Sequence, residues 1–201
     1  FRTTLDANVI ALDAKTGKEL WREKAADIKE GYSMTVAPLV ADGVVITGIS
    51  GAEFGTRGFI DGWDPATGKK LWRTYTIPTP DEPGGDTWKG DTWKLGGGST
   101  WITGSYDAEL NTVYWGIGNP GPFNAAVRPG DNLYTCSVLA LDPKTGKIKW
   151  HYQFSPNNPF DYDSVAEMVL ADMNVEGKPT KVLMDANRNG FFYVLDRTNG
   201  K

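Results

Sequence analysis

The chain has 201 residues, 40% of them hydrophobic, and a net charge of -4 at pH 7, a composition that suits a globular protein with a substantial core. Its acidic and basic residues are mixed along the sequence, which argues against nucleic-acid binding and against a polybasic membrane patch. No apolar run approaches the roughly 20 residues of a spanning helix, and the first residues do not resemble a signal peptide, so the chain is expected to begin inside a longer protein.

Residue usage favours short strands and excludes several common types of active site. The 24 glycines and 12 prolines suit many strands joined by turns better than long helices, so an all-β fold is expected. The single cysteine, Cys136, cannot form an internal disulfide. With only one histidine, His151, zinc, haem and Ser-His-Asp sites are also poorly supported.

A motif that contains an aspartate and a Thr-Gly pair and closes on a tryptophan recurs along the chain. The aspartate and the glycine predict a hairpin, because Asp accepts backbone hydrogen bonds at a turn and Gly takes a positive φ without strain. The tryptophan is expected to dock one unit on the next. The motif occupies residues 11–21, 62–72 and 140–150, and a fourth copy runs from 194 to 201 without its tryptophan.

The spacing of these motifs predicts a β-propeller. Equivalent aspartates lie 51, 78 and 54 residues apart, which suits four-stranded blades and one insertion at residues 76–98. Residues 1–201 are therefore expected to form about four blades of a single propeller domain that is incomplete at both ends. Because such an arc would expose surfaces between blades, stable folding in isolation is not expected.

Two predicted strands end in loops that carry polar side chains. Residues 44–49 alternate like a strand and lead to Glu53 among small residues, where a ligand could approach the backbone. Residues 112–117 form a strand that ends in a glycine- and proline-rich loop with Asn119. The pattern G-x-G-x-x-G at 116–121 does not indicate a dinucleotide site, because the prolines that follow prevent a helix from starting there.

A third loop carries Asp161 and Asp163 after a stiff stretch of proline and asparagine. Residues two apart in an extended segment point to the same side, so the two carboxylates could share a hard cation. Taken alone, the pair also suits a turn before a strand, and Glu53 alone also suits a solvated loop acid.

Together with the tryptophan repeats, these loops closely resemble the PQQ-dependent methanol and ethanol dehydrogenases. The resemblance covers essentially the whole chain and implies an eight-bladed propeller with the quinone and a metal ion near its axis. This chain resembles roughly the middle of the N-terminal half of that propeller. The motifs that carry the resemblance are residues 51–55, 96–101, 118–120, 128–132, 161–163 and 187–197.

The resemblance implies a role for each matching residue. Trp101 matches the indole on which the quinone stacks, and Asp161 matches the catalytic carboxylate. The residues that match quinone-binding positions are Thr35, Ser50, Gly51, Ala52, Ser99, Trp101 and Arg188. The residues that match metal ligands are Glu53, Asn119, Asp161 and Asp163. Asp163 matches an additional carboxylate that is found in the lanthanide-dependent members of the family.

The implied activity is oxidation of small primary alcohols to aldehydes by hydride transfer to metal-activated PQQ, with Asp161 as the general base. The extra charge of Asp163 favours a lanthanide, with calcium as the alternative. The family further implies a cytochrome c-type electron acceptor and a periplasmic location. Two alternatives are a non-enzymatic propeller, such as a scaffold of an outer-membrane assembly machine, and a sugar or polyol dehydrogenase with the same cofactor.

Overall fold

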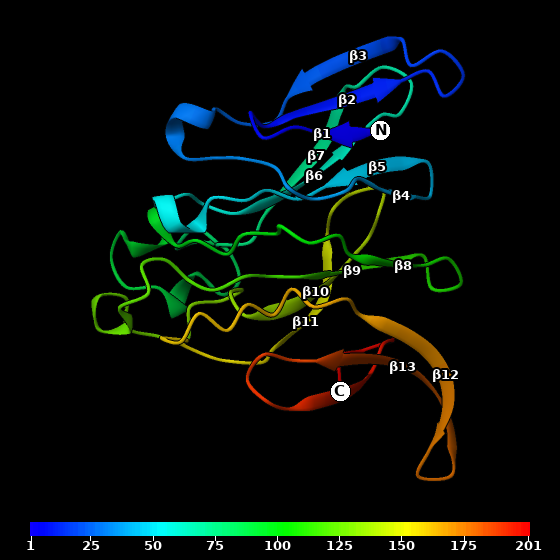
Figure 1. Cartoon of the computed structure of the whole chain (residues 1–201). Coiled ribbons are helices and arrows are strands. Elements are labelled where there is room, and N and C mark those ends of the chain that lie inside the picture. The colour runs from blue at the N-terminus through cyan, green and yellow to red at the C-terminus, as the bar shows by residue number, and fades with distance from the viewer.

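The computed structural model describes all 201 residues, which form four antiparallel sheets that follow one another in chain order (Figure 1). The first two sheets contain β1 (Arg2–Thr3), β2 (Asn8–Leu12) and β3 (Glu19–Lys24), then β4 (Leu39–Ala41), β5 (Val44–Thr47), β6 (Phe59–Trp63) and β7 (Lys70–Tyr75). The last two contain β8 (Ser105–Asp107), β9 (Thr112–Gly116), β10 (Ser137–Leu141) and β11 (Ile148–Gln153), then β12 (Val169–Val175), β13 (Lys178–Ala186) and β14 (Phe192–Asp196).

The remaining regular structure consists of short 3-10 helices. They are η1 (Ile28–Glu30), η2 (Ala52–Phe54), η3 (Gly85–Thr87), η4 (Thr92–Leu95) and η5 (Ala125–Val127). None of the helices has the length and apolar character that a membrane crossing requires. The expected all-β fold is confirmed, and no helix opens directly after the G-x-G-x-x-G pattern.

The repeated aspartate and glycine form the predicted turns between neighbouring strands. Oδ1 of Asp13 accepts hydrogen bonds from the backbone N–H groups of Lys15 and Thr16, at 3.1 and 2.8 Å. Gly17 then takes a φ of 71°, which a residue with a Cβ adopts only with strain. The turns that begin at Asp64 and Asp142 repeat these contacts. The hairpins β2–β3, β6–β7 and β10–β11 therefore share the same type of turn.

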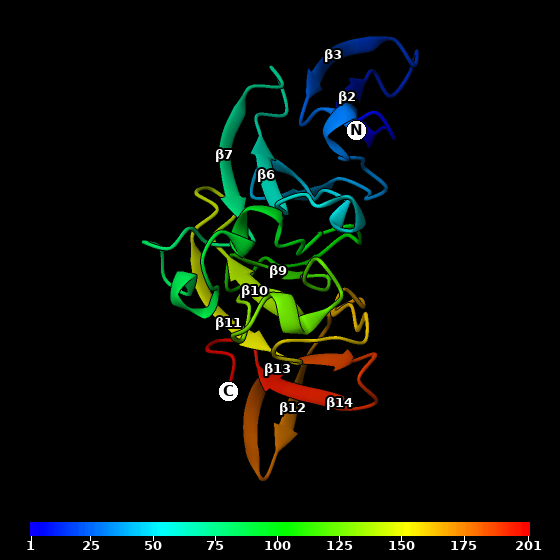
Figure 2. The ribbon, with the colours of Figure 1, turned by 90° about the vertical axis from the view of Figure 1, so that its left-hand side faces the viewer.

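The tryptophans of the repeats join each sheet to the next. The indole N–H of Trp21 donates to the carbonyl of Pro65 at 3.0 Å, and that of Trp72 donates to the carbonyl of Pro143 at 3.1 Å. Each indole also covers the turn glycine of the following sheet, since a Cβ built on Gly68 would lie only 2.8 Å from the Trp21 ring. These tryptophans lie on the edge strands β3 and β7 (Figure 2). The predicted docking of units is confirmed.

Two apolar clusters fill the spaces between the sheets. The larger cluster joins the first three sheets through fully buried side chains such as Val9, Ile46 and Trp115. The smaller cluster joins the third and fourth sheets and includes Tyr114 and Leu183. The two clusters together link all four sheets, and the third sheet contributes residues to both, as expected for blades that pack face to face.

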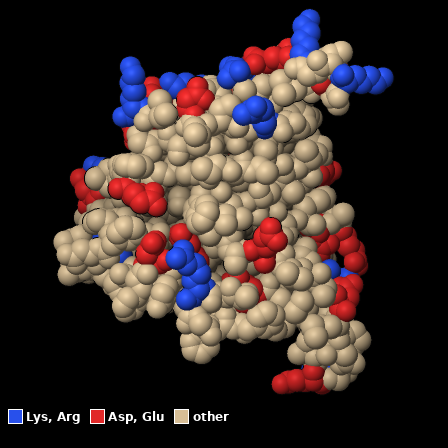
Figure 3. All heavy atoms as spheres, viewed as in Figure 1, with Lys and Arg blue, Asp and Glu red and all other residues tan.

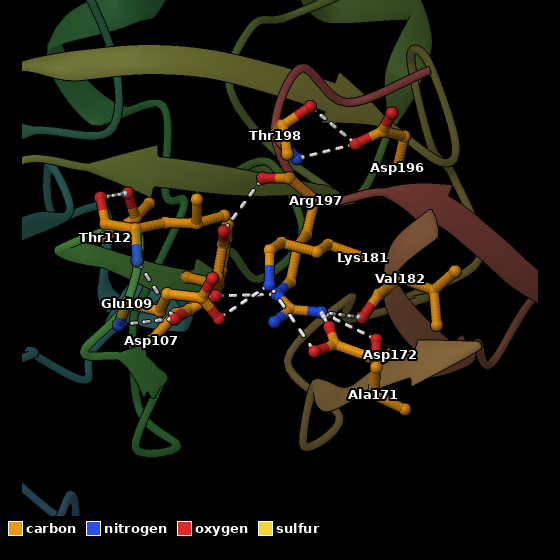
Figure 4. Close-up of polar contacts among 12 residues, drawn as sticks. Asp107, Glu109, Thr112, Ala171, Asp172, Lys181, Val182, Asp196, Arg197 and Thr198 are labelled. Carbon is orange, nitrogen blue, oxygen red and sulfur yellow. Dashed lines mark hydrogen bonds and ion pairs between the residues drawn. The ribbon is translucent and has the colours of Figure 1, made fainter. Parts of the chain in front are cut away.

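A buried arginine adds a polar tie between the third and fourth sheets. The side chain of Arg197 is 6% exposed, and its Nε bonds Oδ2 of Asp107 at 2.6 Å (Figure 4). Its Nη1 bonds Oδ1 of Asp172 on β12 at 2.8 Å. Asp107 belongs to the third sheet and Asp172 to the fourth, so this guanidinium fixes the position of one sheet relative to the other.

The insertion at residues 76–98 forms a closed loop beside the second and third sheets. Its ends meet where the hydroxyl of Thr76 donates to the carbonyl of Gly98 at 2.6 Å. The buried Trp88 anchors its middle through a bond from Nε1 to the carbonyl of Leu133 at 2.5 Å. At its last residue, the backbone N–H of Gly98 donates to the carbonyl of Asn119 at 2.9 Å. The insertion therefore places residues 99–101 next to the Asn119 loop.

Candidate functional site

An open hollow of about 250 Å³, which we call the acidic hollow, gathers residues from four separate segments. Every residue that lines it belongs to the set predicted from the sequence. A larger hollow of about 720 Å³ lies beside β7 and β11, and it contains none of the predicted site residues. The acidic hollow is lined by Thr35, Ser50, Gly51, Glu53, Ser99, Trp101, Asp161 and Asp163.

Hydroxyl groups and a glycine form one wall of the acidic hollow. Oγ1 of Thr35 donates to the carbonyl of Trp101 at 3.2 Å and lies 3.0 Å from Oγ of Ser50. Because Thr35 has one hydroxyl proton, Ser50 is the donor in the second contact. Gly51 has a φ of 123°, and a Cβ there would collide with the carbonyl oxygen of Gly31. Only glycine fits this wall, and its backbone is open to a ligand.

Three carboxylates face the same space from two segments. Glu53 lies in the middle of η2 and is exposed, and Asp161 is exposed as well. Asp163 is only 7% exposed, and its Oδ2 lies 3.4 Å from Nη1 of Arg188. Burial raises the pKa of Asp163, and the negative charge of Asp161 raises it further, while Arg188 opposes them. Burial and the charge of Asp161 thus both disfavour the ionised form of Asp163, and a cation bound in the hollow would offset them.

The backbone between Asp161 and Asp163 differs from the predicted extended segment. Asp161 has a φ of 58°, in the left-handed region, so the chain is kinked at this residue. The prediction that both carboxylates face one side is confirmed, since both line the acidic hollow. They do so from a kinked segment that is not a regular strand.

Asn119, Ala52 and Arg188 do not line the acidic hollow. Asn119 is 2% exposed, and its Nδ2 donates to the carbonyl of Pro120 at 3.2 Å. Asn119 and Ala52 instead line a second hollow, which shares Glu53 with the first. The second hollow measures about 310 Å³ and is lined by Ala52, Glu53, Gly55, Leu95, Asn119, Gly121, Pro122 and Phe123.

The donor set fits a cation that also takes ligands from a bound cofactor. No group of three or more His, Cys, Asp or Glu side chains is close enough to hold an ion unaided. Carboxylate and amide oxygens are nevertheless the ligands that hard cations prefer. The indole of Trp101 and the hydroxyl wall suit a flat polar molecule beside that ion. The residues present therefore fit a planar, oxygen-rich cofactor together with a metal.

Sequence reasoning missed two residues that support the site. A Cβ on Gly118 would lie 2.7 Å from Oδ1 of Asp163, so glycine is required there. Asn187 is buried, and its Nδ2 donates to Oγ of Ser164 at 3.0 Å, which holds the loop that carries Arg188. Gly118 lies in the motif 118–120 that carries the family resemblance, but the sequence alone gives this glycine no role of its own.

The charged surface carries no single large patch on the face viewed in Figure 3. Most basic side chains on this face lie along its upper edge, and acidic side chains predominate in its lower half, with uncharged surface between them. Charges of both signs are therefore present on this face.

Comparison with known proteins identifies the family of the chain. Residues 22–201 match the β-propeller domain of the PQQ-dependent glucose, ethanol and alcohol dehydrogenases. The chain is 51% identical to quinohemoprotein alcohol dehydrogenase ADH IIB of Pseudomonas putida, over 98% of the chain and 31% of that protein. It is 46% identical to the lanthanide-dependent methanol dehydrogenase of Methylacidiphilum fumariolicum, over 100% of the chain and 36% of that protein.

A solved structure agrees with these relatives. The chain superposes on a europium-containing methanol dehydrogenase with a TM-score of 0.96 and 45% identity, over 99% of the chain and 38% of the other protein. The chain thus spans about a third of the length of these relatives. The resemblance inferred from the motifs is confirmed, and the chain belongs to the β-propeller family of the PQQ-dependent glucose, ethanol and alcohol dehydrogenases.

Proposed function

We propose that the protein containing this chain oxidises small primary alcohols, such as methanol and ethanol, to aldehydes. The observation that carries this proposal is the composition of the acidic hollow, whose lining residues all coincide with predicted cofactor, metal or catalytic positions. The relatives named as alcohol and methanol dehydrogenases support the same substrate class. In this proposal the chain is part of a larger eight-bladed disc.

Each residue has a task in the proposed site. The metal ligands are Glu53, Asn119, Asp161 and Asp163, and the quinone contacts are Thr35, Ser50, Gly51, Ala52, Ser99, Trp101 and Arg188. Bound there, PQQ and the metal supply an electrophile that accepts hydride from the alcohol carbon.

The chain's own groups would bind, orient and move a proton. Asp161 is exposed to the acidic hollow, so its carboxylate can take the hydroxyl proton of an alcohol that enters there. Trp101 offers a flat face for stacking. Arg188 is half-exposed and lies beside Asp163, where its charge would stabilise negative charge on a reduced cofactor.

We favour a lanthanide over calcium as the metal. Glu53, Asp161 and Asp163 bring three negative charges to the acidic hollow, which balances a trivalent ion better than a divalent one. Two relatives are named as lanthanide-dependent and europium-containing enzymes, which supports this choice. By family resemblance, we also propose a cytochrome c-type electron acceptor and a periplasmic location.

The test is dye-linked oxidation of methanol and ethanol by the full-length protein reconstituted with PQQ. Activity should require PQQ and should be compared without metal, with calcium and with lanthanum. Activity chiefly with lanthanum is the expected result, and activity chiefly with calcium would keep the enzyme but change the metal. A protein that binds no quinone and oxidises neither alcohol would instead favour the scaffold alternative.

A further inference from the structure

The guanidinium of Arg128 is buried beside the site without a role in the chemistry described above. Arg128 is 0% exposed and begins the stretch 128–132, which carried family resemblance but no predicted function. All four of its hydrogen bonds go to carbonyl oxygens. A buried cation is tolerated only when such partners replace water, so these bonds determine where the neighbouring backbone can lie.

These bonds connect the Asn119 loop to the Asp161 loop. Nε of Arg128 donates to the carbonyl of Pro122 at 2.6 Å, three residues beyond Asn119. Its Nη2 donates to the carbonyl of Asn158 at 2.5 Å, three residues before Asp161. One planar group therefore sets the separation of two loops that carry proposed site residues.

The side chain of Asn158 continues this connection to Asp161. Asn158 is 3% exposed, and its Oδ1 accepts hydrogen bonds from the backbone N–H groups of Phe160 and Tyr162, at 3.0 and 3.1 Å. These two residues flank Asp161, whose φ of 58° is the kink that turns its carboxylate into the acidic hollow. Holding the carbonyl of Asn158 therefore also holds the kinked backbone of Asp161.

We propose that Arg128 is a positioning residue that arranges the proposed metal-binding and proton-accepting groups before substrate binds. This inference rests on the proposed function. The planar guanidinium donates in several fixed directions at once, whereas the ammonium of lysine is a compact point charge. Lysine at this position would preserve the charge but lose the simultaneous contacts with both loops.

The test uses Arg128→Lys in the full-length protein reconstituted with PQQ. Terbium, a luminescent trivalent ion, reports metal affinity independently of turnover. We expect about a tenfold loss of terbium affinity and about a tenfold fall in kcat, because residues that orient metal ligands have effects of this size. KM for methanol is expected to change by less than about threefold, since Arg128 does not line the hollow.

Arg197→Lys is the matched control, because Arg197 is also buried but ties the third sheet to the fourth through Asp107. It should lower the melting temperature while terbium affinity and kcat stay at the wild-type values. Equal terbium affinity and kcat in Arg128→Lys and the wild type would overturn the positioning role. So would losses of the same size in both variants, since they would reflect general destabilisation.

A second variant, Asn158→Ala, decides the matter if Arg128→Lys does not fold. It removes the acceptor for Phe160 and Tyr162, and the same tenfold loss of terbium affinity is expected. Wild-type affinity in Asn158→Ala would overturn the inference. Absence of PQQ-dependent oxidation in the wild-type protein would instead contradict the proposed function, and the terbium titration would still test Arg128 by itself.

Discussion

The backbone N–H of Asn119 donates a hydrogen bond of 2.8 Å to Oδ1 of Asp163. Two proposed metal ligands, 44 residues apart in the chain, are thereby fixed against each other. The other oxygen of Asp163 lies 3.4 Å from Nη1 of Arg188. This carboxylate therefore contacts one proposed metal ligand, Asn119, and one proposed quinone-binding residue, Arg188.

The charge of Asp163 should decide which metal supports activity. Asp163→Asn keeps an oxygen that can accept from Asn119 but removes the negative charge. We expect lanthanum-supported activity to fall about tenfold or more, and calcium-supported activity to fall much less. Dye-linked assays of the full-length protein with each metal measure this difference. Equal losses with both metals would mean that Asp163 has only a structural role.

Asp161 should be essential for turnover but not for folding. Its side chain is exposed, so Asp161→Asn removes the proposed proton acceptor without opening a cavity in the core, and asparagine tolerates the φ of 58° at this position. We expect kcat to fall by about 10² to 10⁴, the usual contribution of a general base, with an unchanged melting temperature. Steady-state kinetics and thermal unfolding measure the two quantities. A variant that keeps its kcat would remove Asp161 from the mechanism.

Trp101 should contribute to quinone affinity through its ring. Trp101→Ala is expected to weaken PQQ binding by about 1 kcal/mol, or roughly fivefold, because aromatic stacking contributes energies of this size. Trp101→Phe, which retains a smaller ring, should lose less. Titration of the full-length apoprotein with PQQ measures the affinity, and identical values for all three proteins would contradict stacking.

Two turn glycines with nearly equal backbone angles should respond differently to alanine. Gly146 has a φ of 69° and Gly17 a φ of 71°, so both substitutions strain the backbone by about 1 kcal/mol. A Cβ on Gly146 would also collide with the indole of Trp72, whereas a Cβ on Gly17 meets nothing within 4 Å. Urea unfolding of the full-length protein should therefore show a larger loss of stability for Gly146→Ala than for Gly17→Ala. Equal losses would mean that indole docking is not energetically important.

Asp185 should limit stability at neutral pH. Its Oδ2 accepts from Asn187 at 2.8 Å, but its Oδ1 is buried without a partner, and burial raises the pKa of this carboxyl above its ordinary value of 3.8. With a raised folded-state pKa, its contribution to stability is full below pH 3.8 and is lost as pH rises through the folded value.

Asp185→Asn removes this titration while keeping an oxygen for Asn187. We expect a gain of about 1 kcal/mol in the free energy of unfolding at pH 7 and little change at pH 3.5. Urea unfolding at the two pH values tests the sign of the effect. A variant that is less stable than the wild type at pH 7 would show that the buried charge has a favourable partner.

The repeats were readable from the sequence because their determinants are local. Each turn depends on contacts within a few residues, such as those between Asp13 and Thr16, and on one glycine with positive φ. The site residues were found through family resemblance, since Glu53 and Asp161 alone look like ordinary loop acids. The structure adds that separate loops bring them to one hollow.

Other parts of the site left no readable pattern. The partners of Arg128 are mostly backbone carbonyls, which every residue possesses, so its role could not be predicted from residue types. The side chain of Asn158 bonds the backbone on both sides of the kinked Asp161, and Asn119 meets Glu53 at the second hollow although the two residues come from separate loops. Such long-range arrangements are set by the tertiary fold.

Docking of each indole on the turn of the next sheet also limits how far local unfolding can propagate along the chain. Trp21 reaches only the turn at Pro65, and Trp72 reaches only the turn at Pro143, so each junction couples two neighbours and no others. A weakened junction would therefore let one sheet open while those beyond the adjacent junctions remain folded. The chain can therefore unfold locally at one junction while the other junctions keep their packing.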